Sequence, residues 1–146
     1  MEPRLLSERL VRPLNILLVD DDDLAVMNMR RAFTRGQLSR ELWAANDGHE
    51  ALAVLRGGAL PQARRLVLLD VDMPRMDGLT MLAEIRRDPA LQATSVVLLT
   101  SSDADEDRAE AFRLNAAGYL LKPATFAQTL ELVAAIDQYW SRVELP

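Results

Sequence analysis

Side chains that could do chemistry together stand at the ends of the short apolar runs of this sequence. Four are carboxylates, one is a hydroxyl and one is an ammonium: Asp20, Asp21, Asp70, Asp72, Thr100 and Lys122. Clustered carboxylates repel one another unless a cation neutralises them, and a set of oxygen ligands suits Mg²⁺. The pattern therefore predicts a magnesium site.

The same residues could also transfer a phosphoryl group. A carboxylate such as Asp70 can act as a nucleophile toward phosphorus and form an aspartyl-phosphate. Lys122 and the metal would neutralise charge on the transferring group, and Thr100 would donate a hydrogen bond to one of its oxygens. We therefore expect Mg²⁺-dependent phosphoryl transfer onto Asp70.

Some of these residues have simpler explanations. An acidic run such as Asp20–Asp23 is also typical of helix capping, and Asp72 and Asp77 are typical of turns. Thr100 alone indicates little, because threonine is common in strands. Lys122 is more informative, since it is the only lysine among 17 basic residues. A compact ammonium at this one strand end favours a chemical role.

The elements that must position these residues follow from an alternation of short apolar runs with longer helical patterns. The expected strands are Asn15–Val19, Leu42–Ala45, Leu66–Leu69, Ser95–Thr100 and Gly118–Leu121. Five strand–helix units predict a parallel sheet with helices on both faces and with strands buried on both faces. The working edge of such a sheet lies at the carboxyl ends of its strands.

Two of the intervening helices have recognisable ends. One is expected from about Leu79 to Arg87, because the residue before Pro89 avoids helical geometry. Another is expected to open at Ser102-Asp103, with Glu106 placed for a capping box, and to be closed by Gly118.

Composition limits the function classes. The 146 residues suit one domain, and 49% hydrophobic with 27% charged residues is ordinary globular usage. Cysteine is absent, and the single histidine, His49, is expected at the surface or at a helix cap. The net charge of −5 argues against nucleic-acid binding, and apolar runs of about four residues are too short for a membrane span. We expect a cytoplasmic protein with a lead-in over residues 1–14 and one domain over 15–146.

Four motifs resemble the receiver domain of bacterial two-component response regulators. They are ILLVDD at 16–21, LDVDMPRMDG at 69–78, LLTS at 98–101 and GYLLKP at 118–123. Each motif alone is only modestly specific, but all four occur in the order and at the spacing of this family. The resemblance extends from about Asn15 to Tyr139. The resemblance implies an α/β, flavodoxin-like fold: a doubly wound, five-stranded parallel sheet with strand order 2-1-3-4-5.

The resemblance also implies which residues bind metal and phosphorus. Asp70 matches the phosphoacceptor, which receives its phosphoryl group from a phosphohistidine of a sensor histidine kinase. Asp21 matches the direct Mg²⁺ ligand, and Asp20 matches its partner, which acts largely through water. Asp72 stands where the family supplies a main-chain carbonyl to the metal.

Three further residues match the switch of this family. Thr100 matches the switch hydroxyl, Tyr119 the aromatic side chain that changes orientation, and Lys122 the phosphoryl-binding lysine. The Lys122–Pro123 bond is typically cis in such domains, which proline allows at small cost.

More narrowly, the chain resembles stand-alone regulators associated with phytochrome kinases. It has a Gly/Pro-containing insertion before the third strand and an aromatic-rich ending, and no output domain is expected. The predicted function is a single-domain response regulator that is charged by a sensor histidine kinase of the bacteriophytochrome type and signals by binding an unknown downstream protein. It would phosphorylate and dephosphorylate itself without being a metabolic enzyme.

Two other functions are compatible with parts of this pattern. A metal-dependent phosphohydrolase could use Asp70 and Asp72 as its Asp-x-Asp pair, but such enzymes favour threonine where this chain has Pro74, and they usually carry a cap domain. A phosphorylation-independent interaction domain is disfavoured because every expected site residue is present.

The last helix predicts a homodimer. Phe126, Leu130, Val133 and Trp140 form one apolar stripe, and Leu132, Ile136, Tyr139 and Val143 form a second stripe about 100° away. Together they span about 180°, more than the roughly 100° that a surface helix needs. Either the N-terminal leucines Leu5, Leu6 and Leu10 cover the excess, or it packs against a symmetry mate. We favour the symmetry mate.

Overall fold

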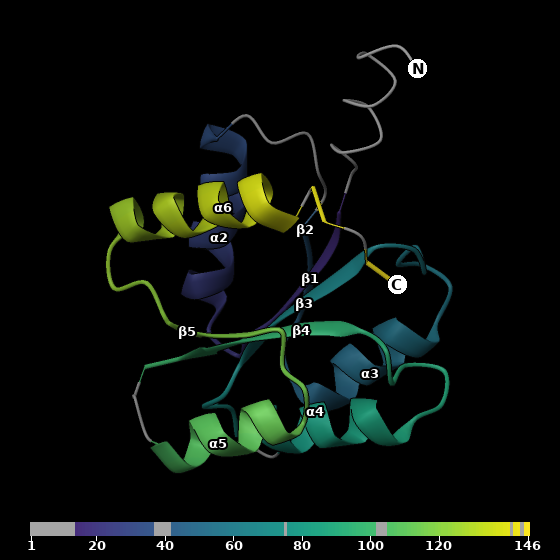
Figure 1. Ribbon diagram of the computed structural model, residues 1–146. Helices are drawn as coiled ribbons and strands as arrows, with labels where there is room; N and C mark the ends of the chain where they lie inside the picture. The colour runs from purple at the N-terminus through teal and green to yellow at the C-terminus, as the bar shows by residue number, and fades with distance from the viewer. Residues whose placement is uncertain (1–13, 37–41, 75, 102–104, 141, 144) are drawn as a thin grey trace.

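Five parallel strands form the centre of the molecule (Figure 1). The computed structural model describes residues 14–36, 42–74, 76–101, 105–140, 142–143 and 145–146. The strands are β1 (Asn15–Val19), β2 (Leu42–Ala45), β3 (Arg65–Asp70), β4 (Ser95–Thr100) and β5 (Gly118–Leu121). Their order in the sheet is β2-β1-β3-β4-β5, so the predicted fold and all five predicted strands are confirmed. Only β3 differs, since it is longer by one residue at each end.

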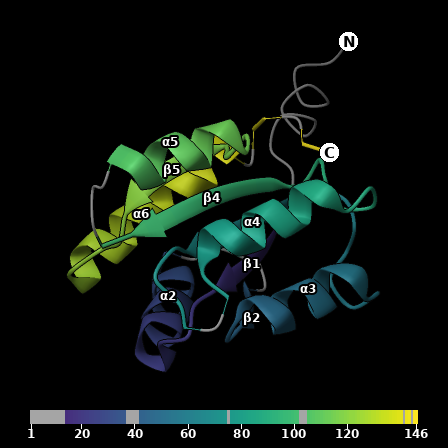
Figure 2. The same ribbon diagram turned by 90° about the horizontal axis from the view of Figure 1, so that it is seen from below.

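Helices cover both faces of the sheet. They are α2 (Asp23–Arg35), α3 (Gly48–Arg56), α4 (Gly78–Arg87), α5 (Asp105–Arg113) and α6 (Phe126–Trp140). Figure 1 shows α2 and α6 on one face, and α3, α4 and α5 on the other; Figure 2 gives the same layers from below. Among the described residues, no helix is both long and apolar enough to cross a membrane.

Aspartates begin three of these helices. Asp22, Asp47 and Asp77 each accept a hydrogen bond from a backbone N–H in the first turn of α2, α3 and α4. Such caps satisfy N–H groups that have no partner inside the helix. The end of α4 at Arg87, before Asp88-Pro89, is confirmed.

The prediction for α5 was wrong at its end. The helix stops at Arg113 and does not continue up to Gly118, which begins β5 as predicted. Asn115, in the connection, has a φ of 57°, a left-handed conformation that a helix cannot continue through. The predicted opening at Ser102-Asp103 lies outside the described residues.

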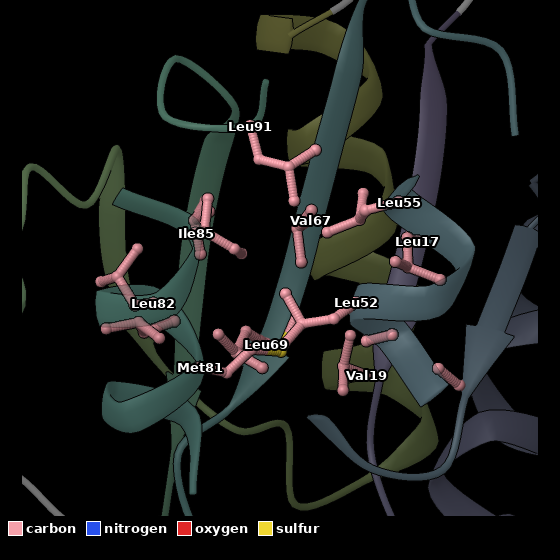
Figure 3. Packing of buried hydrophobic residues seen from close by; sticks show 14 of the residues in the cluster. Leu17, Val19, Leu52, Leu55, Val67, Leu69, Met81, Leu82, Ile85 and Leu91 are labelled. Atoms are coloured by element: carbon pink, nitrogen blue, oxygen red, sulfur yellow. The ribbon is translucent and has the colours of Figure 1, made fainter. Parts of the chain in front are cut away.

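Each face of the sheet contributes to a hydrophobic core. Side chains that alternate along β1 and β3, such as Leu17 and Val67, pack against α3 and α4 (Figure 3). The alternate positions, such as Ile16 and Leu66, pack against α2 and α6. Full burial on both faces explains why β1, β3 and β4 are almost continuously apolar.

The strand β5 departs from that expectation. It is an edge strand, paired only with β4, and Leu121 is 63% exposed. Its apolar sequence therefore does not reflect burial on both faces.

The helix α6 also uses its apolar surface differently from the prediction. Ile136, assigned to the stripe that would face a symmetry mate, is only 3% exposed and lies in the core, with Leu132 packed against it in part. The reason is that α6 packs against both the sheet and α2, and a helix with two neighbours buries a wider arc. Tyr139, 61% exposed, is the residue of that stripe that remains at the surface of the described chain. The homodimer stays a prediction.

A buried arginine anchors the start of the central strand. Arg65 is 7% exposed, and its guanidinium donates hydrogen bonds to the carbonyls of Leu55, Leu60 and Pro61 at 2.8–2.9 Å. Burial lowers its pKa from the ordinary value. Arg65 therefore ties the first residue of β3 to the end of α3 and to the loop that follows it.

Candidate functional site

The sheet brings the predicted site residues to one edge. Asp20 directly follows β1, Asp70 and Thr100 end β3 and β4, and Lys122 follows β5. Because the strands are parallel and adjacent, their carboxyl ends lie side by side. A hydrogen bond of 2.7 Å from the Lys122 N–H to the Thr100 carbonyl extends the pairing to the lysine itself.

Two buried carboxylates share one ammonium at this edge. Asp20 and Asp70 are 2% and 1% exposed. Lys122 Nζ lies 3.2 Å from Oδ2 of each. The other oxygen of each carboxylate, Oδ1, accepts a hydrogen bond from a backbone N–H two residues further along the chain. The Asp22 N–H donates to Asp20 at 2.9 Å, and the Asp72 N–H donates to Asp70 at 3.0 Å. Both carboxylates are thus fixed in position by the fold.

The electrostatics of this cluster favour an additional positive charge. The pKa of Asp70 is raised to about 6. Burial is the largest cause, and the neighbouring carboxylate of Asp20 also raises the pKa, whereas hydrogen bonds from the Asp72 N–H and Lys122 and the charge of Lys122 lower it. The pKa of Lys122 is raised, because the attraction of Asp20 and Asp70 outweighs its own burial, which acts in the opposite direction. One ammonium is therefore too little for the carboxylates that surround it.

The geometry fits a divalent cation. Oxygens of Asp20, Asp21 and Asp70 all lie within 4.8 Å of one another, and Asp21 is exposed, so the cluster is open to solvent on one side. An all-oxygen donor set suits Mg²⁺ and similar hard cations. The structure thus brings together three of the four predicted metal-binding residues through their side chains.

The acidic run after β1 divides between two tasks. Asp20 and Asp21 point into the cluster, whereas Asp22 caps α2 through a hydrogen bond of 3.0 Å from the Leu24 N–H, and Asp23 stands in the first turn of that helix. The capping explanation is therefore right for the second half of the run. Asp77, expected at a turn, caps α4.

Ser101, directly after β4, and Gly78, the first residue of α4, flank the cluster, and the sequence pattern predicted a role for neither. The Ser101 hydroxyl donates a hydrogen bond of 3.0 Å to the Asp72 side chain, which joins the loops after β3 and β4. A Cβ on Gly78 would lie 2.6 Å from the Asp70 carbonyl oxygen, so α4 can approach β3 this closely only with glycine there. The sequence predicted only a turn at Asp77 and did not indicate this close approach.

The predicted switch residues lie close behind the cluster. Thr100 is fully buried at the end of β4. Tyr119 packs partly against the core, and its hydroxyl is buried without a hydrogen-bond partner in the described part of the chain. The expectation of a cis bond between Lys122 and Pro123 was wrong, because no peptide bond of the described residues is cis. The two forms of such a bond differ by only about 0.5–1 kcal/mol, so sequence does not decide between them.

Comparison with known protein families agrees with this geometry. Residues 16–136 match the response regulator receiver domain. This chain belongs to that family. The match begins at the second residue of β1, includes the other four strands and ends within α6, so it contains every residue of the acidic cluster.

Two relatives cover nearly the whole receiver domain. The probable methanogenesis regulatory protein FilR2 of Methanothrix harundinacea is 38% identical over 133 residues, which are 88% of this chain and 84% of FilR2. The response regulator Rcp1 of Synechocystis is 32% identical over 138 residues, 92% of this chain and 94% of Rcp1.

Solved structures show the same fold. The phosphorylated cyanobacterial phytochrome response regulator RcpA has a TM-score of 0.78 and 34% identity, over 90% of this chain and 96% of RcpA. The Mn²⁺-bound form of Rcp1 has a TM-score of 0.76 and 32% identity, over 92% of this chain and 99% of that one. This chain is thus a response regulator receiver whose relatives include phytochrome response regulators.

Proposed function

We propose that Asp70 of this receiver domain accepts a phosphoryl group from a sensor histidine kinase in a Mg²⁺-dependent reaction. One observation carries the proposal: Lys122 Nζ lies 3.2 Å from a buried oxygen of both Asp70 and Asp20 at the carboxyl edge of the sheet. A carboxylate held in this way is a nucleophile with a positive charge already in place beside the bond that it forms.

In the proposed reaction, a carboxylate oxygen of Asp70 forms a bond to phosphorus while the P–N bond of a phosphohistidine breaks. The imidazole leaves with the electron pair of that bond and takes up a proton. Lys122 neutralises charge on the phosphoryl oxygens, and the hydroxyl of Thr100 donates a hydrogen bond to one of them. The backbone N–H of Asp72 keeps the Asp70 carboxyl group oriented.

Asp20, Asp21 and Asp70, with the main-chain carbonyl of Asp72, would hold the Mg²⁺. When bound, the cation supplies positive charge that offsets the negative charge of the incoming phosphoryl group. Support comes from the convergence of the three carboxylates and from the raised pKa of Asp70, which burial and, to a smaller extent, the charge of Asp20 cause. Metal-bound Rcp1 lends further support.

Thr100 and Tyr119 would convert phosphorylation into a change of surface. We assign Tyr119 to this role because its buried hydroxyl has no partner among the described residues, so an alternative orientation that gives it one would be favoured. The partner that reads this change is a further protein.

The phosphodonor that we propose is a phytochrome-type kinase, since RcpA is a phytochrome response regulator. We also propose that the protein forms a homodimer through the surface of α6 that carries Tyr139. Its role would be signalling, without metabolic turnover.

Incubation with Mg²⁺ and acetyl phosphate, followed by intact-mass measurement, tests this function. We expect one added phosphoryl group on the wild type, none on Asp70→Asn, and none with the wild type in excess EDTA. Labelling of Asp70→Asn to the same extent would show that Asp70 is not the acceptor. Steady release of phosphate from simple phosphate esters, without an adduct, would indicate a phosphohydrolase instead.

A further inference from the structure

A pocket lies at the amino end of β3, away from the phosphorylation site. Its volume is about 270 Å³, and Arg65, the first residue of β3, lines it, whereas Asp70 is the last residue of that strand. The end of α3 and the connection between α4 and β4 form most of the remaining wall. We call this cavity the Arg65 pocket.

Much of the wall is apolar. Leu55 and Leu91 belong to the hydrophobic core (Figure 3), and the small side chains of Ala90 and Ala93 lie at the exposed rim. Such a wall favours the apolar part of a ligand over water. The volume is near the lower end of the roughly 300–1,000 Å³ that ligand pockets span, so the pocket suits a small molecule.

The pocket also contains a buried cation that lacks a counter-charge. In the described part of the chain, the guanidinium of Arg65 contacts three carbonyls and forms no ion pair with a carboxylate. Carbonyls carry only partial charges, and burial lowers the pKa of Arg65 because it disfavours the charged form. Arg56, a second cation in the wall, is already paired with Asp88 at 3.0 Å. Arg65 would therefore stabilise a negative charge in the pocket.

Arg65 keeps hydrogen-bond donors in reserve. A guanidinium has five N–H groups, and Nε, Nη1 and Nη2 of Arg65 each donate one hydrogen bond to a carbonyl. One N–H on each Nη thus has no acceptor among the described residues. Two such groups match the two oxygens of a carboxylate. The Thr94 hydroxyl and the Gln62 amide also line the pocket, and neither has a hydrogen-bond partner within the described ranges.

We propose that the Arg65 pocket binds a small monocarboxylate with an apolar body. Arg65 holds the carboxylate, and the apolar body lies against Leu55 and Leu91. A nucleotide or another polyanion suits the pocket less well, because the volume is small and the described wall offers a single uncompensated cation. The site goes beyond the proposed phosphorylation of Asp70 and does not depend on it, since the two lie at opposite ends of β3.

An NMR titration of the full chain with benzoate tests the proposal. We expect shifts of backbone amides centred on Arg65, Leu91 and Thr94, and a dissociation constant of about 1 mM or lower. Benzamide has the same shape without the charge, and acetate has the charge without the ring. Each is expected to bind roughly tenfold more weakly than benzoate. These comparisons change only the ligand, so they do not depend on the folding of a variant.

Two variants test the pocket from the side of the protein. Ala93→Phe fills the rim from an exposed position and is expected to weaken benzoate binding roughly tenfold. Ala127→Phe, at an exposed position of α6 on the other face of the sheet, is the matched control and should bind as the wild type does. Arg65→Met, once circular dichroism has established that it is folded, should bind benzoate no better than benzamide.

Several outcomes would overturn the proposal. Equal affinity for benzoate and benzamide would show that Arg65 does not hold a carboxylate, and equal affinity for acetate would show that the apolar wall contributes nothing. Wild-type affinity of Ala93→Phe would place the ligand elsewhere. So would shifts centred on Lys122, which would locate the anion at the phosphorylation site.

Discussion

Lys122 and the arginines of this protein contact different kinds of partner. Arg65 and Arg86 spread their guanidinium nitrogens over several backbone carbonyls, three for Arg65 and four for Arg86. A planar fork with five N–H groups suits such divergent acceptors, whereas a single ammonium suits two carboxylates that converge on one point. The structure thus gives a physical reason both for the prevalence of arginine and for the one lysine.

The replacement Lys122→Arg is therefore expected to slow phosphorylation of Asp70 by an order of magnitude or more, although the charge is kept. Lys122 Nζ lies 3.2 Å from a carboxylate oxygen of both Asp20 and Asp70. A guanidinium with one nitrogen in that position would occupy the space that the phosphoryl group needs. Intact mass over time with acetyl phosphate gives the rate. Arg87→Lys, at an exposed position, is the control. A wild-type rate for Lys122→Arg would mean that charge alone suffices.

A second residue-scale prediction concerns pH. The pKa of Asp70 is about 6 in the folded protein, above its ordinary value of 3.8, so ionisation of this group opposes folding. The metal-free wild type should lose stability as pH rises from about 4 to about 6, and Asp70→Asn should not share that loss. At pH above 7 we expect Asp70→Asn to be more stable by about 1–2 kcal/mol, after allowance for solvent screening.

Urea unfolding in EDTA at several pH values measures this difference. Addition of Mg²⁺ should reduce the advantage of Asp70→Asn, because the cation stabilises the wild type preferentially. Equal stability of the two proteins at high pH would contradict the assignment of uncompensated charge to this cluster.

At the scale of elements, the close approach of α4 to β3 depends on Gly78. A Cβ at this position would meet backbone atoms, the Asp70 carbonyl oxygen at 2.6 Å and the Val71 Cα at 2.8 Å, and backbone cannot rotate away as a side chain can. The contrast is Gly48, where the nearest atom would be the sulfur of the flexible Met76 side chain.

We therefore expect Gly78→Ala to lower the free energy of unfolding by about 1–3 kcal/mol and to slow acetyl phosphate labelling, since the helix must retreat from Asp70. Chemical denaturation and intact mass provide the two readouts. Gly58→Ala is the matched control, because nothing lies within 4 Å of a Cβ there. If Gly78→Ala matched Gly58→Ala in both readouts, α4 would not be constrained at this point.

Which elements could be predicted depends on where they lie. The central strands β1, β3 and β4 are buried on both faces, so their sequences show continuous apolar runs, and the residue after each run marks the site. The end of α5 had a signal that was missed, because Asn115 is of a residue type that favours the left-handed conformation after a helix. The exposure of β5 could not be predicted, because an edge position has no distinctive sequence. The Ser101–Asp72 hydrogen bond could not be predicted either, because the two residues lie far apart in the sequence and meet only in the folded chain.

At the scale of the whole molecule, the proposed homodimer now rests on less surface than the sequence indicated. With Ile136 in the core, Tyr139 is the residue of the predicted stripe that stays exposed in the described part of the chain, and Leu132 and Val143 are only partly exposed. Sedimentation at micromolar concentration should show a dimer for the wild type, and Tyr139→Glu should shift it toward the monomer. A wild type that stays monomeric at every concentration, with or without acetyl phosphate, would refute the dimer.

The anchoring of β3 by Arg65 has a consequence for how a signal can leave the site. Asp70 ends a strand that is paired along both sides, and Arg65 at the opposite end is held by carbonyls of Leu55, Leu60 and Pro61. The strand cannot slide along its own axis without breaking all of these bonds together. The proposed acceptor is thus held in place, and we expect its phosphorylation to move the segments that follow β1, β4 and β5 and not β3 itself, so that a bond formed at one atom changes the surface around it.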